Sequence, residues 1–145
     1  MAHICSPDDR SFQKQVEACD FPATRFDHRS HLRLAYIYLV DSDVETAIER
    51  MRSALIRLLE HAGVDPAEKF HETLTQAWVL AVFHFMKQTE NCESSNGFID
   101  RNPDMLDSRI MMTHYSEEVL FSKKARRGFV DPNLDLIPRY DGNIA

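Results

Sequence analysis

The sequence predicts an all-α protein, a single-domain helical bundle of about five helices with an irregular C-terminal tail. Three observations predict it. Apolar residues recur at helical spacing through long segments of the chain. The few glycines and prolines, 4 and 6 of 145 residues, lie where helices would start or end. Serine or aspartate precedes most of these segments, as N-cap residues do.

The first two helices are expected over residues 6–19 and 27–40. Ser6 followed by Pro7 and two acidic residues is typical of a helix start. The second segment is nearly all apolar from Leu32 onward, poor in β-branched residues and too long for a strand. It is therefore expected to be a central, buried helix.

The third helix is expected over residues 43–62. Ser42 with Glu45 forms a capping-box pattern, and the apolar residues that follow match a 3.6-residue period. Gly63 stands where a glycine commonly ends a helix. Short connections make consecutive helices antiparallel, so this helix should run back along the second one.

A fourth helix is expected over residues 65–89, with Asp65 as the cap and Pro66 in the first turn. Residues 91–97 read as a polar loop. A helix is then expected from about Asn102 to Thr113, followed by short turns that begin at Ser116 and Ser122.

The whole chain, residues 1–145, is expected to form one domain. Within it, residues 1–5 are expected to be a flexible N-terminus and residues 129–145 an extended tail. There is no internal repeat.

Composition excludes several classes of protein. Hydrophobic residues make up 43% and charged residues 28% of the chain, which is ordinary for a globular domain. A net charge of −6 gives no general attraction to nucleic acid, and no apolar stretch is long enough for a membrane span. The three cysteines form no CxxC pair, so we expect a reduced, cytoplasmic protein. A homodimer is possible, and the basic residues 123–127 are expected to be a solvated surface.

Histidines carry the functional prediction. His28 and His31 are three residues apart, so a helix places them on one face. With alternating helix directions, His71 in the fourth helix and His114 after the next one should reach the same end of the bundle. Four imidazoles at one point predict a transition-metal site for iron, copper or zinc.

The predicted function is a small metal-binding helical protein, a metalloenzyme for a small-molecule substrate. Such an ion would activate bound water or dioxygen. Glu68 and Glu72 lie beside His71 and are candidates for the catalytic base, and Tyr115 is a candidate hydrogen-bond donor.

Two alternatives stay open. The histidines could act as acid/base groups of a metal-free enzyme, or they could be structural residues of a helical interaction or regulatory module. In the structural case, His71 would bond to a carbonyl or to Thr75, and His114 would stabilise a helix C-terminus. An open, concave pocket beside the histidines distinguishes these cases, because an interaction module does not need one.

Overall fold

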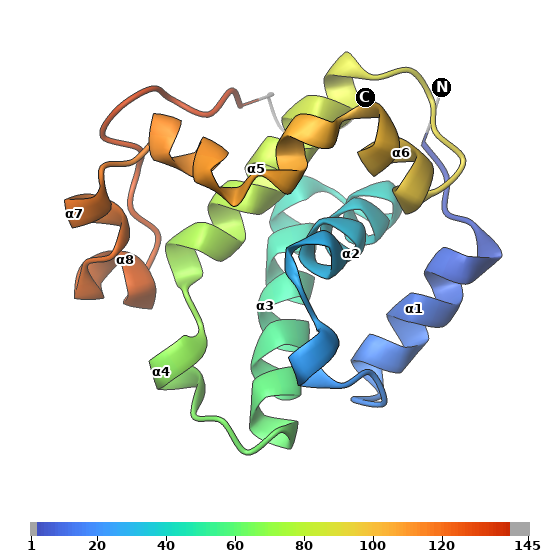
Figure 1. Ribbon diagram of the computed structural model, residues 1–145, viewed down its shortest axis with the longest axis horizontal. Coiled ribbons are helices and arrows are strands. Elements are labelled where there is room, and N and C mark those ends of the chain that lie inside the picture. The colour runs from blue at the N-terminus through green and yellow to red at the C-terminus, as the bar shows by residue number, and fades with distance from the viewer. Residues whose placement is uncertain (1–2, 140–145) are drawn as a thin grey trace.

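The computed structural model describes residues 3–139, and over this range it contains helices and no strands. The prediction of an all-α fold is confirmed. Three helices form the centre and pack against one another in every pairing: α2 (His28–Asp41), α3 (Val44–His61) and α5 (Glu72–Gln88). Figure 1 shows the remaining elements arranged around them.

The outer helices cover different sides of this centre. On one side, α1 (Pro7–Glu17) packs on α2 and α3, and α6 (Ser95–Arg101) packs on α2. At the opposite side of Figure 1, α8 (Lys123–Arg127) packs on α5, and α7 (Glu117–Leu120) packs on α8. Short helical turns complete the chain: η1 (Ala23–Arg25), α4 (Pro66–Lys69), η2 (Pro103–Leu106) and η3 (Ser108–Thr113).

The helix starts follow the capping chemistry of the sequence. Ser6 and Asp9 form a reciprocal capping box on α1. Asp27 caps α2 by accepting a hydrogen bond from the Ser30 amide. For α3 the predicted Ser42 box is wrong: Asp43 is the N-cap and accepts from the Thr46 amide. A carboxylate is a stronger acceptor than a hydroxyl for this role.

The fourth predicted helix is broken in two. Backbone dihedrals turn extended at Phe70 and His71, which separates α4 from α5. His71 then caps α5, because its Nδ1 accepts a hydrogen bond from the Leu74 amide. No glycine or proline marks this break, and histidine is not a favoured N-cap, so the sequence shows no strong sign of it.

The region after α5 also differs from the prediction. The polar stretch expected as a loop contains the start of α6, and residues 103–113 form the two 3₁₀ turns η2 and η3 rather than one helix. The turns expected at Ser116 and Ser122 are confirmed, since these residues cap α7 and α8.

The core follows α2, where residues 34–39 are all buried. Both tyrosines in this stretch still satisfy their hydroxyls. Tyr36 donates to the Ile4 carbonyl and Tyr38 donates to a Glu17 carboxylate oxygen at 2.6 Å. The helix therefore contributes its apolar area without leaving a buried donor unpaired.

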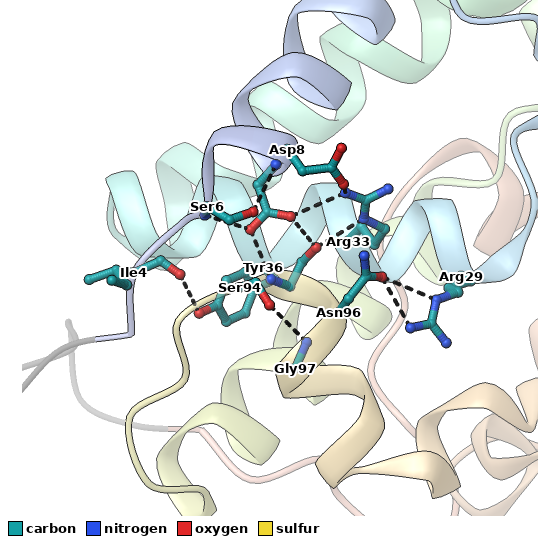
Figure 2. A network of polar contacts seen from close by, with 11 residues as sticks. Ile4, Ser6, Asp8, Arg29, Arg33, Tyr36, Ser94, Asn96 and Gly97 are labelled. Carbon is teal, nitrogen blue, oxygen red and sulfur yellow. Dashed lines mark hydrogen bonds and ion pairs between the residues drawn. The ribbon is translucent and has the colours of Figure 1, made fainter.

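Asp9 is a fully buried carboxylate that joins three helices. It accepts hydrogen bonds from the backbone amides of Ser6 and Ser95, from the Ser95 hydroxyl and from the Arg33 guanidinium. Figure 2 shows this network around Ser6 and Arg33. Burial alone would raise the pKa of Asp9, but these hydrogen bonds outweigh it and hold the pKa below its usual value.

Both ends of the described chain make contacts with the bundle. His3 and Ile4 bond to the backbone of Met86 and Cys92, and the Leu134 amide bonds to the His114 carbonyl. Among the described residues, none of the helices combines the length and apolar character needed to cross a membrane.

We expect Asp9→Asn to lower the free energy of unfolding by about 2–4 kcal/mol, because an amide NH₂ would face donors that now meet a carboxylate. Asp8→Asn is the matched control. Asp8 pairs with the same Arg33 but its side chain is 77% exposed, so its loss should cost less than about 0.5 kcal/mol. Urea unfolding followed by circular dichroism measures both, and equal losses would contradict the role given to Asp9.

Candidate functional site: an apolar cavity

A cavity of about 630 Å³ lies between the start of α2, the second half of α3 and the first half of α5. The turn η3 and the helix α7 close its other side. Most of its lining is aliphatic or aromatic, and these residues are Phe26, Leu55, Leu58, Leu59, Phe70, Leu74, Trp78, Met111, Met112, Leu120 and Phe121.

The cavity has a buried floor and an open mouth. Among the lining side chains, Leu58, Trp78, Met111 and Leu120 are buried. Exposed residues line the mouth, and these are Asp27, Lys69, Ser108, Arg109, Glu117 and Phe121. The shape is that of a pocket rather than a closed void.

Local sequence explains the apolar walls. Leu58 and Leu59 are adjacent on α3, which widens the apolar face of that helix beyond the stripe that packs on α2 and α5. The break before α5 places Phe70 and His71 in the lining. The wall on the α5 side therefore depends on a turn that the helical pattern does not reveal.

His28 lies in the first turn of α2 and lines the cavity. Its Nε2 donates a hydrogen bond to the Met105 carbonyl at 2.8 Å. Its ring meets Trp78 edge to face, with 4.6 Å between the centroids. Trp78 is the single tryptophan of the chain, so its fluorescence reports on this cavity alone.

His71 joins two walls of the cavity. Its Nε2 lies 2.7 Å from the Leu120 carbonyl oxygen and must carry the proton, while its Nδ1 accepts from the Leu74 amide and must carry the lone pair. The ring is therefore neutral, and burial lowers the pKa of His71. This hydrogen-bonded arrangement tethers α7 to the start of α5.

His31 differs from both of these histidines. It lines the cavity, yet neither ring nitrogen makes a hydrogen bond within the described residues, and its Nδ1 is completely buried. Burial, with a smaller contribution from the neighbouring His28, lowers the pKa of His31 to about 4. At neutral pH the floor of the cavity therefore carries an uncharged imidazole.

Charges gather at the mouth and largely balance. Arg109 is held by both carboxylate oxygens of Asp107. The Asp27 carboxylate caps α2, and hydrogen bonds from Ser30 lower its pKa. Lys69 and Glu117 are exposed to solvent. No full charge stands at the floor.

The predicted metal site is wrong. Among residues 3–139, no group of three or more His, Cys, Asp or Glu side chains could hold a metal ion. His28, His31 and His71 do line one cavity, but His71 uses both ring nitrogens within the protein. His114 is outside the lining, and its Nδ1 bonds to the Asp135 carbonyl of the tail. The predicted metalloenzyme function depended on this site and is therefore wrong as well.

The three predicted catalytic residues also lie outside the cavity lining. Glu68 is exposed on α4. Glu72 forms a two-point ion pair with Arg52 at 2.8 and 2.6 Å, which holds the pKa of Glu72 below its usual value. Tyr115 donates its hydroxyl to the Val130 carbonyl, and burial raises the pKa of Tyr115 to about 12.

The sequence reasoning missed most of the cavity wall. Leu55, Leu58 and Leu59 belong to the apolar period of the third predicted helix, but periodicity shows only which face is apolar and not whether that face is filled. Phe121 gives no separate signal, because it follows Val119 and Leu120 in the sequence and reads as part of an apolar run.

No family model, no curated protein and no solved structure matches the chain. The geometry of the cavity is the feature of the structure that bears on function.

We expect unfolding free energy to fall as the pH drops from 7 to 5. The folded state keeps His31 and His71 neutral, while the unfolded chain takes up protons near pH 6.5, so acid favours unfolding. For His31 alone, the shift from 6.5 to about 4 corresponds to a loss of about 2 kcal/mol over this interval.

Urea unfolding at pH 7 and pH 5 tests this expectation, with His31→Phe as the variant and His61→Phe as the control. His61 is exposed and lies outside the cavity lining. The stability difference between the two pH values should shrink in His31→Phe and stay unchanged in His61→Phe. The same pH dependence in all three proteins would show that His31 is not the group responsible.

Proposed function

We propose that the protein binds a small, largely apolar organic molecule in this cavity. One observation carries the proposal: a recess of about 630 Å³ with apolar and aromatic walls reaches the buried floor of the bundle. Small-molecule sites are typically recesses of about 300–1,000 Å³ with apolar linings and a few polar groups.

The lining supplies the binding energy. Each 100 Å² of apolar ligand surface removed from water stabilises the complex by about 2.5 kcal/mol. Loss of translational and rotational freedom offsets part of this.

The mouth supports the same function. Phe121 is 59% exposed and lines the cavity. An aromatic ring at the entrance offers apolar surface that an entering molecule would cover. A helical interaction module would not require a recess below such a ring, so the cavity favours a small molecule over a protein partner.

We expect the neutral, apolar fluorophore N-phenyl-1-naphthylamine to bind once per chain. Its emission should rise in the apolar cavity, and Trp78 emission should fall as energy transfers to the bound probe. Fluorescence titration with excitation of tryptophan measures both signals. A linear, non-saturating response, or a rise in probe emission without loss of Trp78 emission, would contradict binding at this site.

The double variant Leu55→Phe/Leu59→Phe fills part of the cavity and should weaken probe binding at least tenfold. Ile56→Phe is the matched control, because Ile56 lies on the same helix α3 but is not part of the lining. Its affinity should stay close to that of the original protein. Equal affinity in the filled variant and the control would overturn the proposed site.

A further inference from the structure

From the chemistry of the cavity floor, we infer that the bound molecule carries a neutral hydrogen-bond acceptor, a carbonyl oxygen, and that the Nε2–H of His31 donates to it. This inference rests on the proposed function and names the polar group of the ligand.

His31 is the available side chain. Of the other histidines in the lining, His28 bonds to the Met105 carbonyl and His71 bonds to the Leu120 carbonyl and the Leu74 amide. Thr75 donates its hydroxyl to the His71 carbonyl. Within the described chain, His31 is thus the one imidazole of the lining with neither nitrogen used.

The two nitrogens of His31 are not equivalent. Nδ1 is buried and has no hydrogen-bond partner among the described residues. Nε2 is not among the buried atoms that lack a partner. Nε2 is therefore the nitrogen that a molecule in the cavity can reach. A polar atom that borders a cavity and makes no hydrogen bond within the protein can orient a ligand by forming a hydrogen bond to it.

The proton belongs on Nε2. A neutral imidazole has one N–H and one lone pair, and an orphaned buried N–H is rarer in proteins than an under-satisfied acceptor. With the lone pair on the buried Nδ1, the Nε2–H faces the cavity as a donor. A donor at the floor selects a ligand with an acceptor oxygen.

The charges around His31 favour a neutral acceptor over a carboxylate. The cations in the lining are Lys69 and Arg109, both at the exposed mouth, and Arg109 already pairs with Asp107. The anions Asp27 and Glu117 also line the cavity. A carboxylate at the floor would lose its hydration without meeting a cation there, which is costly in apolar surroundings.

Three probes of one shape test the inference: phenylcyclohexane, 4-phenylcyclohexanone and 4-phenylcyclohexanecarboxylate. Their dissociation constants are measured by calorimetry at pH 7.5 for the original protein, for His31→Phe and for the control His61→Phe. The decisive quantity is the affinity of the ketone relative to the hydrocarbon. We expect this ratio to fall about threefold to tenfold in His31→Phe, the range of one neutral hydrogen bond, and to stay unchanged in His61→Phe.

The possible results distinguish failure of the inference from failure of the proposed function. An unchanged ratio in His31→Phe, or a carboxylate that binds more tightly than the ketone, overturns the inference about the ligand while leaving the cavity site intact. Failure of the hydrocarbon to bind the original protein overturns the proposed function itself.

A second measurement does not depend on the variant folding. Long-range ¹H–¹⁵N spectra of the original protein identify which nitrogen of His31 carries the proton. We expect a proton on Nε2 and a further change in its shift on addition of the ketone. A proton on Nδ1 overturns the inference.

Discussion

The packing of α2 among α3, α5 and α6 is the constraint on which the structure depends. Because residues 34–39 of this helix are all buried, it has no free side, and each neighbouring helix is positioned against it. Its first turn is the exception. There His28 and His31 face a space that α3 and α5 do not fill, so the cavity lies at the N-terminal end of the central helix.

On the opposite side of α2, the buried carboxylate of Asp9 also fixes how neighbouring helices pack on this helix. It joins α1 to Arg33 of α2 and to Ser95 of α6 through hydrogen bonds and an ion pair, beside the apolar contacts of Phe12 and Phe98. The molecule thus has a polar junction on one side of its central helix and an apolar recess on the other. A satisfied polar junction specifies one arrangement of helices, because any shift would leave a buried group unpaired.

Sequence patterns predicted the parts of the fold that depend on local chemistry. The caps at Ser6 and Asp65 and the glycine at position 63, with φ of 78°, follow rules that act within a few residues. The break at Phe70 coincides with a distant contact, the hydrogen bond from His71 to the Leu120 carbonyl. The start of α6 combines a local cap, in which Ser94 accepts from the Gly97 amide, with a distant contact from the Ser95 amide to Asp9. The site failed for a related reason: placing four histidines near one end does not determine which atoms already have partners within the protein, and His71 has two.

The tether between His71 and α7 ends on a main-chain oxygen and not on a side chain. On that wall of the cavity, the Leu120 side chain sets the shape, whereas the Leu120 carbonyl oxygen makes the contact that holds the wall in place. The residue at position 120 can be exchanged for a larger or smaller apolar one while the carbonyl that secures the wall is retained. The volume of the cavity can therefore change at position 120 while the contact that secures α7 to α5 stays the same.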